Sequence, residues 1–150
     1  MAIKATDVMT SSDRPSLITT DEFHADTGDR HWFGTWLGGR VVELGWGTAK
    51  MELDIREEFL REGGTVAGPI IMGAADMVLY AAVMSAYEKG RKSVTADMTM
   101  HFLRRPTGKM LKAHAIIIKF GRRLAMGRIE VMMDDDPRMV AHVAATYALP

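Results

Sequence analysis

Residues 63–88, GGTVAGPIIMGAADMVLYAAVMSAYE, are strongly apolar and predict one buried helix. Pro69 suits the first turn of a helix, because that turn needs no N–H from it. Lys89 and Gly90 then supply a cation and a helix-ending glycine. The helix is therefore expected to span residues 68–89. Apolar side chains point in every direction around it, so we expect protein to surround it on nearly all sides.

Asp76 is the only acidic residue between Glu62 and Glu88. A buried carboxylate is costly unless it is paired or hydrogen-bonded, so this charge indicates a role beyond folding. Two alternatives stay open. Asp76 can bond to a neighbouring element and serve structure alone, or the segment can span a membrane, which takes about 20 apolar residues. The charge in mid-helix, the proline and the amphipathic strands that follow argue against a membrane span.

Composition favours a single soluble globular protein. The chain has 150 residues, of which 47% are hydrophobic and 25% are charged, as in ordinary globular domains. Lys plus Arg and Asp plus Glu both number 19, so the chain lacks the excess of positive charge that is typical of nucleic-acid-binding proteins. The absence of cysteine excludes disulfides, thiolate nucleophiles and cysteine zinc sites. With no secretory signal visible at the N-terminus, we expect a cytoplasmic protein without nucleic-acid or membrane partners.

The remaining periodicity predicts antiparallel strands around the helix. Residues 1–20 lack periodicity and are expected to form a loosely ordered arm, so that one domain spans residues 21–150. A short amphipathic helix is expected within residues 23–37. Alternating apolar and polar residues predict strands at 40–44, 48–55, 94–103, 110–120, 124–133 and 139–149. The expected fold is α+β, with one long buried helix wrapped by a curved antiparallel sheet of about six strands.

The start of the predicted helix carries a family resemblance. Asp76 follows Ala67-Gly68-Pro69 at nine positions after Ala67. This resembles the hotdog-fold superfamily, and within it the small acyl-CoA thioesterases of the phenylacetate-pathway type, in which His-Gly-Gly precedes an acidic residue at this spacing. The resemblance covers residues 35–149. Other segments that look like this family are Phe102–Pro106, Gly121–Arg123 and the terminal strand with Ala144, Thr146 and Tyr147.

The resemblance implies an acyl-CoA thioesterase that needs no cofactor, with coenzyme A as part of the substrate. In such an enzyme the Gly68 N–H polarises the thioester carbonyl, and Asp76 acts as general base for water or as nucleophile. An unsatisfied donor at a helix N-terminus suits an oxyanion, and a partly desolvated carboxylate is a stronger base than one in water. We expect a medium-chain or aromatic acyl group, contacted by Tyr80 one turn after Asp76.

Gly68 and Asp76 cannot serve one carbonyl from the same helix. They are eight residues apart, which is roughly 12 Å at about 1.5 Å of rise per residue. The mechanism therefore requires a symmetric dimer, in which Gly68 of one chain meets Asp76 of the other. Hotdog dimers, whose long helices lie side by side, are similar to this arrangement. Such a homodimer can also pair into a dimer of dimers.

Further residues are expected to bind the substrate. The segment before the helix is similar to a family subgroup with Gly-Gly-Thr-Val-x-Gly-Pro. Arginines at strand ends match places where family members often hold the phosphates of coenzyme A, to which the guanidinium fork is suited. No metal-ligand spacing appears among the histidines, so no metal site is expected. The remaining candidates for substrate binding are Thr65, Val66, Asp97, Arg104, Arg105, Arg122 and Arg123.

Two departures from the family pattern leave a second function open. Ala67 replaces the histidine, and Pro69 replaces the second glycine and removes one N–H from the helix start. The alternative is therefore a non-catalytic acyl-CoA-binding dimer of the same fold. A hotdog dehydratase ranks last, because it needs a histidine at the site and none of the five histidines lies in or just before the central helix.

Overall fold

The computed structural model describes residues 14–28 and 32–150. The described helices are α1 (Thr20–Gly28), α2 (Trp32–Leu37) and α3 (Gly68–Met84), with the 3-10 turns η2 (Glu57–Phe59) and η3 (Gly90–Lys92). The strands are β1 (Arg40–Gly45), β2 (Thr48–Asp54), β3 (Leu60–Arg61), β4 (Thr65–Val66), β5 (Val94–Phe102), β6 (Met110–Phe120), β7 (Leu124–Met133) and β8 (Asp136–Ala148).

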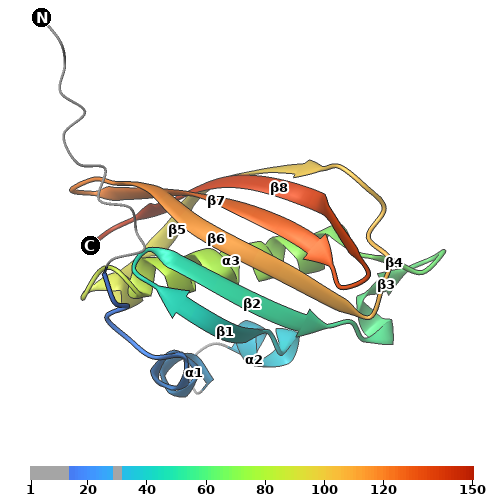
Figure 1. Cartoon of the computed structure of the whole chain (residues 1–150), viewed down its shortest axis with the longest axis horizontal. Coiled ribbons are helices and arrows are strands. Elements are labelled where there is room, and N and C mark those ends of the chain that lie inside the picture. The colour runs from blue at the N-terminus through green and yellow to red at the C-terminus, as the bar shows by residue number, and fades with distance from the viewer. Residues whose placement is uncertain (1–13, 29–31) are drawn as a thin grey trace, which may run out of the picture.

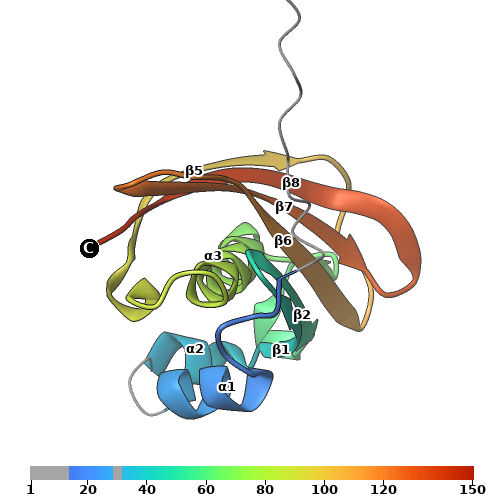
Figure 2. The same ribbon diagram turned by 60° about the vertical axis from the view of Figure 1, so that its left-hand side comes forward.

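Six strands form one antiparallel sheet in the order β1-β2-β6-β7-β8-β5. The sheet curves around α3, and α1 and α2 lie on the opposite side of α3 from β5, β7 and β8 (Figures 1 and 2). This confirms the predicted α+β hotdog architecture, in which one apolar helix lies inside a curved sheet. β5 follows α3 in the chain but lies at the sheet edge beside β8.

One side of α3 is less covered than the rest. Most of its side chains are buried, as the apolar sequence predicted. Gly73, Asp76 and Tyr80 follow one another at helical spacing and are only half-buried, and Met72 is 46% exposed. These residues share one stripe of the helix, because positions three and four apart lie on the same face. The sheet therefore leaves open the stripe that carries Asp76.

α3 begins at Gly68 as predicted but ends at Met84, earlier than the expected Lys89. Ser85 caps this end, and its Oγ donates to Ala82 O (2.8 Å) and accepts from Gly47 N–H (3.0 Å). The side chain thus takes part in bonds that compete with continued helix. The prediction relied on the later glycine as the stop signal, whereas the serine ends the helix.

The predicted short helix within residues 23–37 is two helices in the structure, α1 and α2. A capping box starts α1: Glu22 N–H donates to Thr19 Oγ1 (3.1 Å), and Thr19 N–H donates to Glu22 Oε2 (2.7 Å). Phe23 and Leu37 are fully buried and anchor the two helices to the domain. The N-terminal segment therefore supplies part of the core.

A small hairpin that periodicity did not reveal precedes α3. β3 pairs with β4, and Gly63 and Gly64 between them have positive φ values of 87° and 76°. Glycine is the residue that adopts this region without strain. Ala67 N–H then donates to Phe59 O (2.8 Å), which fixes the direction in which the chain enters α3.

Within the described residues, no helix is long and apolar enough to cross a membrane. The cytoplasmic location stays a prediction. The division into an arm of residues 1–20 and a domain of residues 21–150 also stays a prediction, and residues 1–13 lie outside the described part.

Candidate active site

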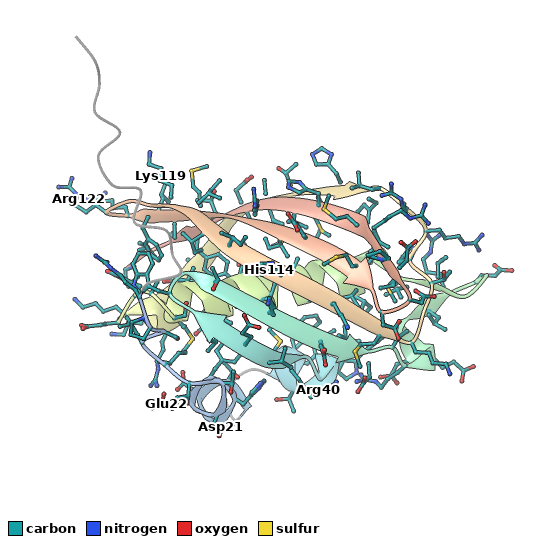
Figure 3. All side chains as sticks on the ribbon, viewed as in Figure 1. Asp21, Glu22, Arg40, His114, Lys119 and Arg122 are labelled. Carbon is teal, nitrogen blue, oxygen red and sulfur yellow. The ribbon has the colours of Figure 1, made fainter. Side chains whose placement is uncertain are left out.

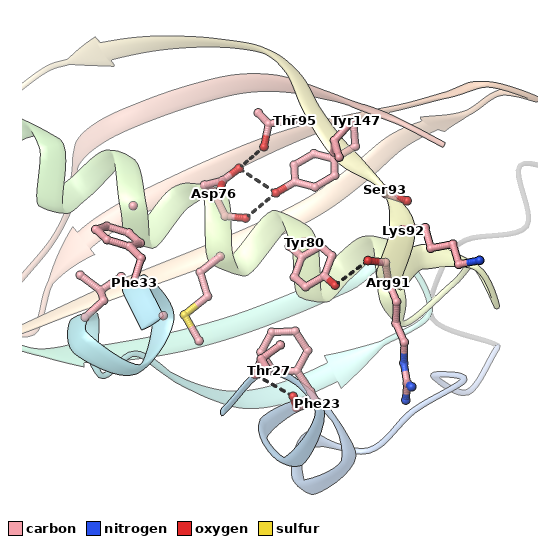
Figure 4. A pocket seen from close by; sticks show the side chains of 15 residues that line it. Phe23, Thr27, Phe33, Asp76, Tyr80, Arg91, Lys92, Ser93, Thr95 and Tyr147 are labelled. Atoms are coloured by element: carbon pink, nitrogen blue, oxygen red, sulfur yellow. Dashed lines mark hydrogen bonds between the residues drawn. The ribbon is translucent and has the colours of Figure 1, made fainter. Parts of the chain in front are cut away.

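Two hydroxyl groups hold the carboxylate of Asp76. Tyr147 Oη and Thr95 Oγ1 each donate a 2.7 Å hydrogen bond to Oδ1 (Figure 4). Tyr147 Oη also lies 3.2 Å from the backbone oxygen of Asp76. Oδ2 accepts no hydrogen bond from the residues that the structure describes. The half-buried carboxylate is therefore anchored through one oxygen and has the other available for chemistry.

A bulge in β5 brings Thr95 to this site. Thr95 pairs with Tyr147 across β5 and β8, and the register then shifts so that Asp97 pairs with Thr146. The extra residue, Ala96, lets Thr95 turn toward α3 while Asp97 faces outward and is exposed. Simple alternation puts Thr95 and Asp97 on one polar face, and the bulge separates them.

Aromatic rings pack side by side behind the carboxylate. Tyr80 stacks on Tyr147 with ring centres 6.2 Å apart, and Phe23 of α1 lies 6.1 Å from Tyr80. Tyr80 Oη donates to the backbone oxygen of Arg91 (3.1 Å). Burial raises the pKa of Tyr80, and burial, followed by the nearby Asp76 charge, raises the pKa of Tyr147 far above its usual range. Both phenols therefore stay protonated at neutral pH.

Asp76 lines a pocket of about 650 Å³ between α1, α2, α3 and the start of β5. This volume lies within the range of small-molecule sites. The pocket wall is mostly apolar and aromatic, with two cations at the η3 side (Figure 4). Besides Asp76, Thr95 and Tyr147, the lining residues include Phe23, Phe33, Leu37, Met77, Tyr80 and Arg91.

Gly68 is the first residue of α3, at the end remote from this pocket. No described residue accepts a hydrogen bond from its N–H. A Cβ added at Gly68 would lie 3.4 Å from the ring of Phe102, which is 56% exposed at the end of β5. With Asp76 eight residues on, roughly 12 Å of helix separates the two. Within one chain, therefore, the structure does not bring Gly68 and Asp76 together.

Thr65, Val66 and Asp97 do not line the pocket that contains Asp76. Val66 is buried, and its N–H donates to Pro106 O (3.0 Å), whereas Thr65 is half-buried beside it in β4. Both precede Gly68 and belong to its end of α3. Tyr80 is the predicted substrate-binding residue that does line the pocket with Asp76.

The four candidate arginines form two pairs at opposite ends of the sheet. Val94 pairs with Ala148, and Ala148 pairs with Leu124, so Arg122 and Arg123 lie at the Thr95 end (Figure 3 labels Arg122). Arg104 and Arg105 follow the other end of β5, roughly 30 Å away at about 3.3 Å per strand residue. Their guanidinium groups donate to Met139 O (2.8 Å) and Gly63 O (3.0 Å), respectively.

Two residues of the site, Thr95 and Tyr147, were not predicted from the sequence as hydrogen-bond partners of Asp76. Tyr147 lies on the inward face of β8, which the alternation of Val143, Ala145 and Tyr147 could have indicated. Thr95 carried no such signal, because the bulge reverses its face. No group of three or more His, Asp or Glu side chains that could hold a metal ion occurs in the described residues.

Comparison with known proteins decides the family. The sequence profile of the Thioesterase superfamily matches residues 63–140, from the β3–β4 hairpin into β8. The chain belongs to the thioesterase superfamily. It is a thioester hydrolase with the hotdog fold. No curated protein sequence shows a significant match to this thioesterase.

Solved structures agree with this family. A protein classed as a thioesterase from Silicibacter sp. TM1040 is 30% identical, with a TM-score of 0.79 over 90% of this chain and 94% of that chain. A variant of the phenylacetic acid degradation protein PaaI from Thermus thermophilus is 25% identical, with a TM-score of 0.68 over 79% and 98%. A thioesterase from Haemophilus influenzae, 16% identical, has a TM-score of 0.79 over 89% and 91% and shows the shared fold.

Proposed function

We propose that this thioesterase hydrolyses a medium-chain or aromatic acyl-CoA, with Asp76 as the catalytic carboxylate. The observation that supports this most is the state of Asp76: Oδ1 is held by Tyr147 and Thr95, Oδ2 is unbonded within the described residues, and the carboxylate lines an apolar pocket. A fixed, partly desolvated carboxylate is suited to take a proton from water or to attack a carbonyl carbon.

The reaction is balanced with water as the only co-substrate. As general base, Asp76 takes one proton from water while the oxygen adds to the thioester carbon and the carbonyl oxygen becomes an oxyanion. Collapse of this intermediate breaks the C–S bond, and the thiolate of coenzyme A recovers the proton from Asp76. As nucleophile, Asp76 would instead form an acyl anhydride and release the thiolate of coenzyme A. Water would then hydrolyse the anhydride, which regenerates the Asp76 carboxylate and supplies the proton that the thiolate takes up.

The oxyanion needs a donor that this chain does not place beside its own Asp76. We assign that donor to the N–H of Gly68 of the partner subunit, at the positive end of α3. Two features are compatible with a symmetric dimer: the Gly68 N–H has no described acceptor, and β5 is an edge strand with Val94 62% and Phe102 56% exposed. Such a dimer has two equivalent sites.

The pocket suits the acyl group, because Phe33, Met77 and the ring of Tyr80 line it and keep part of their surface accessible. The phosphates of coenzyme A need cations. In the proposed dimer Arg104 and Arg105 approach the partner subunit's pocket together with Gly68 of their own chain. Arg122 and Arg123 lie at the Thr95 end of the sheet. Each site would then have one arginine pair from each subunit to bind the phosphates.

The test is thiol release from a panel of short, medium, long and aromatic acyl-CoAs, with Asp76→Asn as the central variant. We expect medium-chain or aromatic substrates to be hydrolysed, and we expect Asp76→Asn to lower kcat at least about 100-fold. Asp135→Asn, an exposed substitution in the β7–β8 turn, is the matched control. Full activity of Asp76→Asn would refute the role of this residue. Thermal stabilisation by acyl-CoA without any thiol release would favour the binding protein instead.

A further inference from the structure

Tyr147 is the more deeply buried of the two donors to Asp76. Its side chain is 3% exposed, whereas Thr95 lies on an exposed edge strand. Its hydroxyl is 2.7 Å from Oδ1 and 3.2 Å from the backbone oxygen of the same residue. A phenol has one proton to donate, and a carboxylate is the stronger acceptor, so the bond to Oδ1 receives that proton.

Packing fixes the direction of this hydroxyl. The ring of Tyr147 stacks on Tyr80 at 26° between the ring planes, and Tyr80 is itself held by Phe23 and by its bond to Arg91 O. The Tyr147 backbone pairs with Thr95 in the sheet. Neither the ring nor the strand can move without disturbing the core. A donor with so little freedom holds its acceptor at little entropic cost.

We propose that Tyr147 is a positioning residue of this thioesterase: it holds Oδ1 of Asp76 so that Oδ2 faces the reacting water or thioester carbon. The inference rests on the proposed function, because it takes Asp76 as the catalytic group. Tyr147 does not touch the substrate carbonyl in this account. It acts through the carboxylate, and its hydrogen bond favours the ionised form that the reaction needs.

The electrostatic surroundings are simple enough for a pH measurement to report on this bond. Thr95 donates to the same oxygen from β5. The described residues of α2 and β5 that line the pocket carry no titratable group. The other charged or titratable side chains that line the pocket are Tyr80 of α3 and Arg91 and Lys92 of η3. Asp26 of α1 forms an ion pair with Arg91.

The decisive variant is Tyr147→Phe, which keeps the ring and removes only the hydroxyl. We expect kcat to fall about tenfold to a hundredfold, as for loss of a hydrogen bond to a charged group, with KM changed less than about threefold. The acid limb of the kcat profile should move to higher pH, because the ionised carboxylate loses a donor. A merely structural role would lower thermal stability and leave that limb in place.

The controls separate this inference from the proposed function. Tyr87→Phe removes a hydroxyl that lies 3.4 Å from Pro150 O, outside the pocket, and should behave as wild type. An inactive Asp76→Asn beside a Tyr147→Phe with wild-type kcat and acid limb would overturn the role of Tyr147 alone. A fully active Asp76→Asn would overturn both.

A second substitution covers the case in which Tyr147→Phe does not fold. Incorporation of 3,5-difluorotyrosine at position 147 keeps the size of the ring and makes the phenol a stronger acid and donor. A stronger donor favours the ionised carboxylate further, so the acid limb should move to lower pH. An unmoved limb in the folded fluorinated protein would overturn the proposal.

Discussion

Asp26 of α1 forms an ion pair with Arg91 of η3, with 2.9 Å between Asp26 Oδ2 and Arg91 Nε. The Asp26 side chain is only 13% exposed, whereas that of Arg91 is 56% exposed. Both ends of the pair adjoin the pocket, because Phe23 and Thr27 line it from α1 and Arg91 lines it from η3. The ion pair therefore links the two walls between which the acyl group is proposed to bind.

Loss of this ion pair should weaken substrate binding more than chemistry. For Asp26→Asn we expect KM to rise about twofold to fivefold with kcat nearly unchanged, since partly exposed ion pairs contribute up to about 1 kcal/mol. Steady-state kinetics with the best acyl-CoA of the panel measure this. Asp21→Asn, an exposed change in the same helix, is the control. An unaltered KM in Asp26→Asn would show that substrate binding does not depend on the ion pair between Asp26 and Arg91.

Removal of the Phe23 side chain should destabilise the whole protein. Phe23 of α1 is fully buried against Tyr80, so Phe23→Ala leaves a cavity that costs about 3–5 kcal/mol in the free energy of unfolding. Ile118→Ala, at a side chain that is 61% exposed, should change this free energy by no more than about 0.5 kcal/mol. Urea unfolding of both variants makes the comparison. Equal stability of the two would mean that α1 is not an integral part of the domain.

Acid should weaken the protein partly through Asp136. Its carboxylate accepts hydrogen bonds from Arg138 Nε and Nη2, and this guanidinium lowers the pKa of Asp136 from 3.8 to about 2. A pKa that is lower in the folded state contributes stability above the unfolded value, and this stability is lost as pH falls through the folded value. We expect the contribution to be complete above about pH 4 and absent below about pH 2.

Unfolding experiments between pH 5 and pH 2 test this account of Asp136, and Asp136→Asn should flatten the pH dependence of stability within that window. Arg138→Gln should flatten it less, because it removes the guanidinium but keeps the backbone N–H that donates to Asp136 Oδ1 (2.9 Å). A wild-type slope in either variant would contradict the assignment.

The fold was predictable because its strongest signals are local. The apolar run that starts at Pro69 and the alternation in residues 110–120 and 124–133 each specify an element without reference to the rest of the chain. The pairing of β5 with β8 has no such local signal, since it joins segments separated by two further strands. The end of α3 was misplaced because the bonds of Ser85 to Ala82 O and Gly47 N–H depend on the folded structure.

The candidate site was predictable only at Asp76, where a charge in an apolar helix is unusual enough to be seen in one sequence. Its partner Tyr147 is 71 residues away in the chain, and Thr95 reaches it through a bulge that alternation cannot anticipate. The two arginine pairs, treated together in the sequence, lie at opposite ends of the sheet. Side-chain partnerships of this kind are set by tertiary register.

The central claim is that each active site combines Asp76 of one subunit with the Gly68 N–H of the other, and mixing two inactive variants tests it directly. Asp76→Asn removes the carboxylate. Gly68→Pro removes the donor, and the preceding Ala67 already has the extended backbone, with φ −64° and ψ 140°, that a residue before proline adopts. Each variant alone should lose most of its activity.

A mixed dimer of the two variants contains one site with both groups intact and one site with neither. Random reassociation after unfolding and refolding of an equal mixture should therefore restore about one quarter of wild-type activity, since half of the dimers are mixed and each has one working site. Thiol release by the refolded mixture, compared with each variant refolded alone, is the measurement. Recovery near that level is the predicted result. No recovery from a mixture that size exclusion and mass spectrometry show to contain mixed dimers would contradict the shared site.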